Sequence, residues 1–181
     1  MKQLLARLTD PTEAAVVDHL TIRLITKDEQ ARWDGLVRQR HYLKNARLVG
    51  ERLCYVVECQ GQWVALLGWT AAAYHLKGRD QWMGWSDTQR RGRLHLVANN
   101  ARFVVLSKPG QYPNLASRAM GMNLARLSAD WEAVYGHPIL VVESFVDEQL
   151  FRGTAYKASG WRALGQTEGY QRVAEDFYVA H

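Results

Sequence analysis

Two apolar segments joined by a tight turn constrain the fold of this chain more than any other feature. Residues 52–59 and 62–69 are both rich in aliphatic and aromatic side chains, and only Gln60 and Gly61 separate them. This arrangement predicts a β-hairpin, because a two-residue turn containing glycine can reverse the chain between neighbouring strands. A sheet is therefore expected at the centre of the fold.

Helix and strand signals alternate along the rest of the chain. Thr26 and Glu29 form a capping box that predicts a helix to about Arg40, and Ser86 and Gln89 form a second one that opens a short arginine-rich helix. The other expected elements are strands at 21–25, 103–106, 139–145, 161–164 and 176–179, and helices at 114–127, 130–135 and 149–159. This order predicts an α/β fold with a mixed central sheet flanked by helices.

The length of 181 residues favours one compact domain. We expect a short N-terminal lead-in at 1–20 and a single domain at 21–181. Cys54 and Cys59 lie five residues apart on one predicted strand, so they should point to opposite faces and remain unpaired. The sequence has neither a signal-peptide pattern nor an apolar stretch long enough to span a bilayer, so we expect a cytoplasmic protein without a membrane partner.

The block from Arg79 to Arg118 interleaves arginines, tryptophans and asparagines in a chain of net charge +5. Guanidinium groups bind phosphate oxygens bidentately and aromatic rings stack on bases, so the block predicts a DNA-binding surface. The candidate contacts there and nearby are Arg79, Trp85, Arg90, Arg91, Arg93, Asn100, Arg102, Asn114, Arg118 and Arg152. The competing interpretations are a hydrated helix face for the arginine cluster, turn-shaping amides for Asn100, and a simple helix cap for Asn114.

Four side chains are candidates for catalysis. Glu143 is a lone charge on an apolar strand and Asp147 follows it, so they could supply a general base or help to hold a divalent ion such as Mg²⁺; the alternative is a structural salt bridge. Tyr156 could attack a phosphodiester or simply pack in the core. His41 is expected at a helix C-terminus, where the dipole favours its protonated form, as an acid–base group or as a cap.

Several short motifs resemble the DruA-like family, which is named after a protein of the Druantia anti-phage system and also occurs fused to transposase domains. The matching segments are His41-Tyr42-Leu43, Val49-Gly50-Glu51, Trp82 to Asp87, Asn99 to Phe103, Asn114 to Ser117, Phe145 to Asp147, Phe151 to Tyr156, Gly160-Trp161 and Leu164 to Thr167. The resemblance implies a DNA-linked role in defence or in mobile elements, with DNA as partner. A helicase or transposase is a further candidate partner, for which the chain would serve as a non-catalytic interaction module.

The order of elements also resembles the acyl-CoA N-acyltransferase (GNAT) fold. That likeness implies a pyrophosphate-binding loop before the helix at Asn114, and it would let Tyr156 protonate a leaving thiolate. The loop keeps Gln111 and Ala116 of the family pattern but has Asn114 in place of a glycine, so acetyl-CoA is not expected as the cofactor. Acyl-CoA-dependent N-acyl transfer is therefore the alternative to a DNA-binding protein that cleaves or modifies DNA.

Overall fold

A computed structural model describes residues 19–107, 112, 114–167, 170–174 and 177–180. The chain divides into two compact units. Unit 1 consists of Met1–Ala72 and His95–Trp161, and unit 2 consists of Ala73–Leu94 and Arg162–His181. All but the last two residues of the expected lead-in lie outside the described residues.

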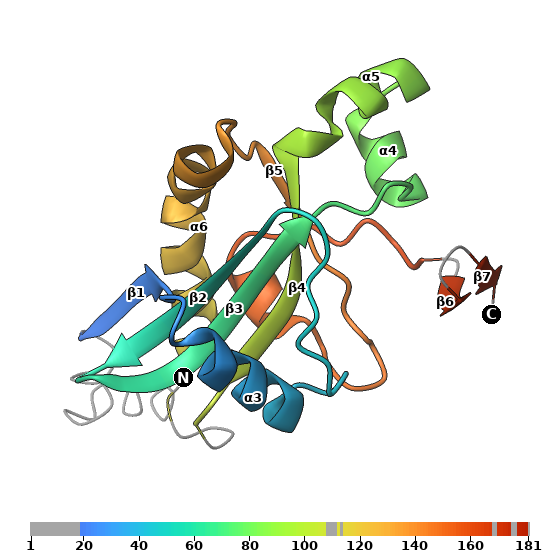
Figure 1. Cartoon of the computed structure of the whole chain (residues 1–181). Helices are drawn as coiled ribbons and strands as arrows, with labels where there is room; N and C mark the ends of the chain where they lie inside the picture. The colour runs from blue at the N-terminus through green and yellow to red at the C-terminus, as the bar shows by residue number, and fades with distance from the viewer. Residues whose placement is uncertain (1–18, 108–111, 113, 168–169, 175–176, 181) are drawn as a thin grey trace, which may run out of the picture. The chain divides into compact units, whose positions relative to one another are not determined.

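A five-stranded sheet forms the centre of unit 1 (Figure 1). The strands lie in the order β1 (Leu20–Leu24), β2 (Arg52–Cys59), β3 (Gln62–Ala71), β4 (Val97–Val105) and β5 (Val141–Glu143). Neighbouring strands are antiparallel from β1 to β4, whereas β5 runs parallel to β4. The hairpin turn has positive φ angles at both Gln60 (49°) and Gly61 (76°), which suits the right-handed twist of the two strands. The predicted α/β class with a mixed sheet is confirmed.

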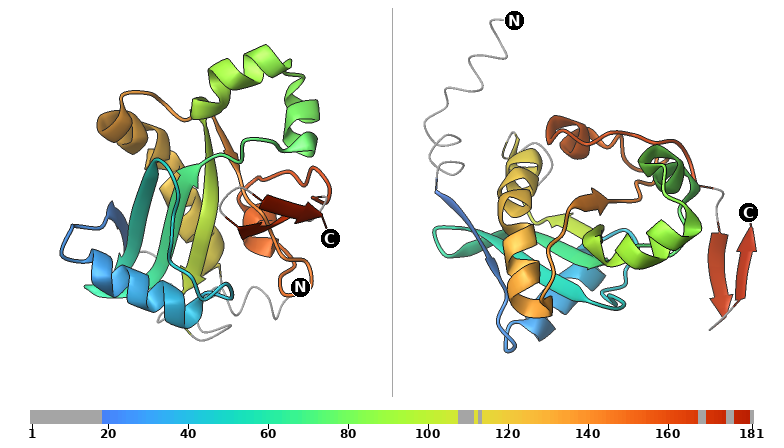
Figure 2. Two further views of the ribbon diagram at one scale, coloured as in Figure 1. Left: turned by 45° about the vertical axis from the view of Figure 1, so that its right-hand side comes forward. Right: turned by 90° about the horizontal axis from the view of Figure 1, so that it is seen from above.

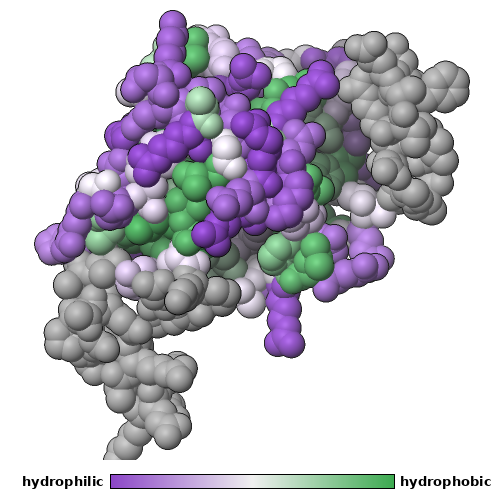
Figure 3. Space-filling view, turned by 60° about the horizontal axis from the view of Figure 1, so that its bottom comes forward, coloured by the Kyte–Doolittle hydropathy of each residue, from purple (hydrophilic) through white to green (hydrophobic). Residues whose placement is uncertain are grey.

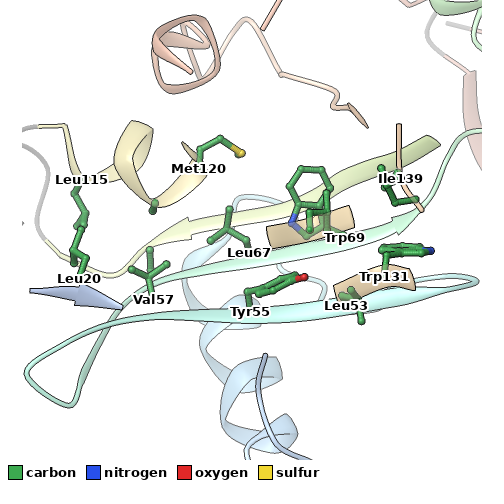
Figure 4. Packing of buried hydrophobic residues seen from close by; sticks show 14 of the residues in the cluster. Leu20, Leu53, Tyr55, Val57, Leu67, Trp69, Leu115, Met120, Trp131 and Ile139 are labelled. Atoms are coloured by element: carbon green, nitrogen blue, oxygen red, sulfur yellow. The ribbon is translucent and has the colours of Figure 1, made fainter. Parts of the chain in front are cut away.

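Helices cover both faces of the sheet in unit 1 (Figure 2). Helix α6 (Leu115–Tyr135) packs on one face over Tyr55, Leu67 and Trp69 (Figure 4). Helix α3 (Gln30–Arg40) packs on the other face, where its buried residues meet a second cluster that includes Val56 and Leu66. Alternate residues of β2 and β3 thus enter two different cores, because successive strand side chains point to opposite faces.

Trp33 anchors α3 to the sheet. Its ring lies directly over Gly68, and its indole nitrogen donates to the backbone oxygen of Tyr55 at 3.1 Å. A side chain at position 68 would occupy the volume that the ring fills. The glycine in the middle of β3 is therefore explained by close packing, which is one of the few reasons for glycine inside a strand.

Several expected boundaries shift in the structure. Strand β4 begins at Val97 instead of 103, so the two asparagines at 99 and 100 belong to the strand. The helices expected at 114–127 and 130–135 form the single helix α6, because Leu127 and Trp131, four residues apart, continue the same buried stripe. Strand β5 spans three residues, the strand expected at 161–164 is absent, and the expected helix at 149–159 is reduced to α7 (Thr154–Ala158).

The two cysteines behave as their spacing predicts. Cys54 lies in the core under α3 and Cys59 in the core under α6, and both are free thiols. In the described part of the chain, no helix has the length and apolar character needed to cross a bilayer.

Unit 2 contains two short helices, α4 (Lys77–Met83) and α5 (Asp87–Arg93), and a pair of antiparallel strands, β6 (Tyr170–Ala174) and β7 (Phe177–Ala180). A 3₁₀ turn, η1 (Leu94–Leu96), follows α5. The capping box at α5 is confirmed, since the Gln89 amide donates to Ser86 Oγ and the Ser86 amide donates to Gln89 Oε1. At α3 only the return bond forms: Thr26 donates its backbone N–H to Glu29 Oε2 at 2.9 Å, and the helix begins at Gln30.

The contact between Trp33 and Gly68 gives a testable prediction. A Cβ at position 68 would lie 2.9 Å from Trp33 Cη2 and 3.2 Å from Arg102 Cβ, so Gly68→Ala should lower the free energy of unfolding by about 1–3 kcal/mol. Gly35→Ala is the matched control, because nothing lies within 4 Å of a Cβ there and alanine favours the helix by roughly 0.5–1 kcal/mol. Urea denaturation of both variants measures the difference, and equal stability of the two would contradict the packing described here.

Candidate functional site

A β-bulge in β4 determines which of its side chains face α6. Gly68 of β3 pairs with Arg102, but the next residue, Trp69, pairs with Asn100, so β4 carries one extra residue at this point. In a regular strand residues 100 and 103 would point to opposite faces. Here Asn100 and Phe103 both contact Tyr156 of α7.

Tyr156 is the centre of a hydrogen-bond network in unit 1. Its hydroxyl donates to Asn100 Oδ1 at 2.8 Å. The hydroxyl of Ser144 lies within donating distance of two acceptors, Tyr156 Oη at 3.1 Å and the Asn100 backbone oxygen at 3.0 Å. Burial raises the pKa of Tyr156, and the hydrogen bond from Ser144 opposes this only in part. The phenol therefore holds its proton at neutral pH and acts as a fixed hydrogen-bond donor.

The network lies where β4 and β5 diverge. The two strands pair only from Val97 to Asn99, and beyond this point β5 leaves the sheet. Aromatic rings pack around the phenol of Tyr156: Trp161 meets it edge-on at 4.9 Å between ring centroids and Phe103 does so at 6.3 Å. The polar groups that bond the Tyr156 hydroxyl thus lie next to aromatic rings.

His41 and Tyr42 follow the last turn of α3 and lie in the same region of unit 1. Tyr42 contacts Phe151 edge-on, with 5.4 Å between the ring centroids. Burial raises the pKa of Tyr42 and the charge of Asp147 adds to this effect, while Tyr42 in turn adds to the raised pKa of Tyr156. His41 is the C-cap residue of α3, and its Nδ1 accepts from the Leu43 amide at 3.2 Å.

His41 does not have the raised proton affinity that its place at a helix end suggests. Burial, together with the positive charges of Arg102 and Lys44, lowers its pKa to about 4. Loss of hydration outweighs the helix dipole here, because only 7% of the residue is exposed. The imidazole is therefore neutral at pH 7.

The guanidinium of Arg102 is directed to backbone oxygens. It donates to the oxygens of Asn45 at 2.6 Å, Arg47 at 3.1 Å and Ala101 at 2.7 Å. These bonds hold the segment after α3 against β4, and in this arrangement Arg102 positions the site instead of presenting a free fork to a phosphate.

Glu143 and Asp147 differ in their surroundings. Val142 packs in the core under α6 and Ser144 reaches Tyr156, so alternation along the strand turns Glu143 to the opposite face. Glu143 is buried and has an interaction partner. Asp147 is half-buried, and its Oδ1 accepts from the Gln149 amide at 2.9 Å. Among the described residues, no group of three or more His, Cys, Asp or Glu side chains could hold a metal ion.

Two arginines of the predicted DNA surface are buried inside unit 2. Arg79 is 1% exposed, donates to the Ala73 backbone oxygen and pairs with Asp80 at 2.8 Å. Arg90 is 5% exposed, donates to His75 Nδ1 and pairs with Asp80 at 3.4 Å. Asp80 thus links α4 to α5, and both arginines have a structural role in this arrangement.

The other candidate contacts remain at the surface. Arg91 and Arg93 are exposed on α5, Trp85 is half-buried between α4 and α5, and Trp82 is 53% exposed. In unit 1, Asn114, Arg118 and Arg152 are exposed. Asn114 is the N-cap of α6 with φ 64° and no side-chain capping bond, whereas Gln111 lies outside the described residues.

The sequence interpretation missed Ser144, and it named Tyr42 only as part of a family motif. Alternation along β5 could have identified Ser144, because it lies on the same side as the apolar Val142. It also missed the basic character of residues 30–52, which hold six arginines and lysines but two acidic residues. A charge count over shorter windows would have found that segment.

The low pKa of His41 gives a prediction about stability and pH. Its pKa in the folded protein (about 4) lies below the ordinary value of 6.5, so the unfolded chain binds the proton more tightly. The stability from keeping His41 neutral is present above pH 6.5 and is lost as the pH falls toward 4, by an amount on the order of 2 kcal/mol. The His41→Gln variant should not show this part of the loss of stability at low pH.

Urea denaturation of the wild type and of His41→Gln between pH 7 and pH 4.5 measures this effect. His19→Gln is the control, because His19 is exposed. If the wild type and His41→Gln lost stability in parallel, His41 would not be buried as a neutral group.

Comparison with solved structures identifies proteins with a similar fold. The chain is similar to aminoglycoside N-acetyltransferase AAC(6')-Iy in complex with CoA, with a TM-score of 0.55 and 13% identity over 86% of this chain and 96% of that chain. It is also similar to the apo aminoglycoside 6'-N-acetyltransferase AAC(6')-IG from Acinetobacter haemolyticus, with a TM-score of 0.51 and 11% identity over 86% of this chain and 99% of that one. The predicted GNAT-like fold is therefore confirmed.

Comparison at the level of sequence identifies the family. No curated protein matches the chain. The family model described as Druantia protein DruA matches residues 1–178, which is nearly the full length. The predicted resemblance is confirmed, and the chain belongs to the DruA family of the Druantia anti-phage system.

Proposed function

We propose that this protein binds DNA in anti-phage defence, and that helices α4 and α5 of unit 2 make the principal contact. One observation supports this more than any other: unit 2 exposes the indole of Trp82 together with the guanidinium groups of Arg91 and Arg93. A large aromatic ring exposed to water is unfavourable without a partner, and an indole stacks on any base.

The charges of unit 2 fit this function. Residues 73–94 contain five arginines and lysines but two acidic residues. Asp80 is already engaged by Arg79 and Arg90, and Asp87 pairs with Arg90 at 3.3 Å. Arg91 and Arg93 form no ion pair with any described residue and are available for phosphates. The buried pairs hold the two helices in a fixed geometry, which lowers the entropy lost on binding.

The Tyr156 network of unit 1 is the best candidate for chemistry on the bound DNA. Tyr156 is a neutral phenol with an oriented hydroxyl, which suits hydrogen-bond or proton donation to an oxygen of the substrate better than nucleophilic attack. His41, which is neutral, and Asp147 could accept a proton in the same region. Glu143 stays a candidate general base from the opposite face of β5.

Salt dependence tests the proposed DNA contact. The slope of log affinity against log salt is negative, and each lost phosphate contact reduces its magnitude by roughly 0.7–0.9. The double variant Arg91→Gln/Arg93→Gln should therefore reduce the magnitude by up to about 2. Trp82→Ala should weaken single-stranded DNA binding by about 1–3 kcal/mol and leave the slope unchanged. Fluorescence anisotropy over a salt series measures both effects.

Arg32→Gln is the matched control for charge, because Arg32 lies in unit 1 with its guanidinium over the Trp63 ring at 3.9 Å. The DNA affinity of the Arg32→Gln variant should stay within about twofold of that of the wild type. A wild-type affinity for DNA that did not fall with salt would rule out the proposed contact.

Tyr156→Phe tests the proposed chemistry. The change removes one hydroxyl and keeps the ring, so nicking or modification of labelled DNA should fall by about 100-fold or more while DNA affinity is retained. Tyr135→Phe is the control, since that hydroxyl bonds only the backbone of Arg52. Intact-mass analysis of DNA and protein, with and without Mg²⁺, reports the product, and the same assay on Glu143→Gln tests the general base. Full activity of Tyr156→Phe would exclude this hydroxyl from the reaction.

Acyl transfer is the second candidate function. Its support is the likeness to acetyltransferases that were solved with CoA, together with a tyrosine at the point where β4 and β5 diverge. A thermal shift with acetyl-CoA that DNA does not produce would favour acyl transfer over action on DNA.

A further inference from the structure

A cavity of about 300 Å³ lies in unit 1 beside α3; its apolar residues belong to the cluster under α3, whereas Tyr156 packs against the cluster under α6. Its walls come from α3, from the segment that follows the helix, and from the start of β2. The lining residues are Gln30, Asp34, Arg38, Asn45, Ala46, Arg47, Leu48, Arg52 and Cys54. Figure 3 turns the side of unit 1 that carries α3 toward the viewer, and hydrophilic side chains there surround smaller hydrophobic patches.

The cavity has an excess of positive charge. Three arginines, Arg38, Arg47 and Arg52, line it together with one acidic residue, Asp34. That carboxylate accepts a hydrogen bond from Gln30 Nε2 at 2.8 Å, and Arg52 donates to the Leu48 backbone oxygen at 3.2 Å. No described carboxylate lies within ion-pair distance of the three arginines, so their charges are not neutralised within the described residues.

The rest of the lining is apolar. Ala46, Leu48 and Cys54 belong to the hydrophobic core under α3 and are each 6–8% exposed. A cavity with convergent polar groups and an apolar part is typical of a small-molecule site, and this volume is at the lower end of the range for such sites. A ligand that matches both parts has an anionic group and a flat, weakly polar body.

We propose that this cavity binds a phosphate-bearing ligand of nucleotide size. The guanidinium groups bind the phosphate oxygens through charge-assisted, bidentate hydrogen bonds, and the base lies against Ala46, Leu48 and Cys54. The ligand is either a free nucleotide or the 5′-phosphorylated end of a DNA strand. The site does not depend on DNA binding by α4 and α5, since it is formed by unit 1 alone.

Equilibrium binding of deoxyadenosine monophosphate, deoxyadenosine and inorganic phosphate tests the site. The monophosphate should bind about tenfold or more tightly than deoxyadenosine, because only the monophosphate reaches the arginines. Arg38→Gln should weaken its binding by about tenfold or more, as should Arg47→Gln in the segment that follows α3. Arg40→Gln is the matched control: it removes the same charge from the same helix but from outside the cavity, so the affinity should stay within about twofold.

Short oligonucleotides with a 5′-phosphate or a 5′-hydroxyl identify the source of the ligand. Any contact with unit 2 is common to both oligonucleotides and does not affect the comparison. If the wild type prefers the phosphorylated end and Arg38→Gln removes this preference, the ligand of the cavity is a DNA end. Equal binding of the two, with the monophosphate still bound, assigns it to a free nucleotide. The proposal is overturned if the monophosphate fails to bind at millimolar concentration and the 5′-phosphate has no effect, or if Arg40→Gln is as damaging as Arg38→Gln.

Discussion

The central strands of unit 1 are apolar on both faces, and the rest of that unit depends on covering them. Each face of β2 and β3 carries its own buried cluster, so one helix is not enough. Helix α6 covers one face with Met120 and Trp131, and α3 covers the other with Trp33 and Val37. Sheets buried on both faces are usual where helices lie on either side. The apolar surface buried in both layers then contributes to the stability of the same unit.

The Tyr156 hydrogen-bond network of unit 1 lies where β5 leaves the sheet, instead of at the centre of the sheet. The bulge in β4 turns Asn100 and Phe103 toward Tyr156, and the early end of β5 leaves room for α7 beside them. Burial keeps the phenol of Tyr156 and the imidazole of His41 neutral, because a charge on either would lose its hydration. A buried edge with neutral, oriented polar groups is well suited to hydrogen bonding with a substrate that carries its own charge.

The arginines fall into two populations with different physical roles. Arg79, Arg90 and Arg102 are directed to carboxylates or to backbone oxygens, which offset the loss of hydration of their charges. Arg91 and Arg93 are exposed, as are the arginines around the cavity beside α3. The first population holds loops and short helices in place, and the second leaves the positive charge of the chain available for an anionic partner.

The sequence by itself determined the elements whose signals are local. The hairpin around Gln60 and Gly61 and the capping box at Ser86 depend on residues close together in the chain, and the α/β order and the family follow from a series of such local signals. Only the tertiary structure decided that Arg79 and Arg90 are buried, that Ser144 instead of Glu143 meets Tyr156, and that three arginines line one cavity. These outcomes depend on a one-residue bulge and on how short segments fold back on one another, because burial and pairing are set by contacts that form only in the folded chain.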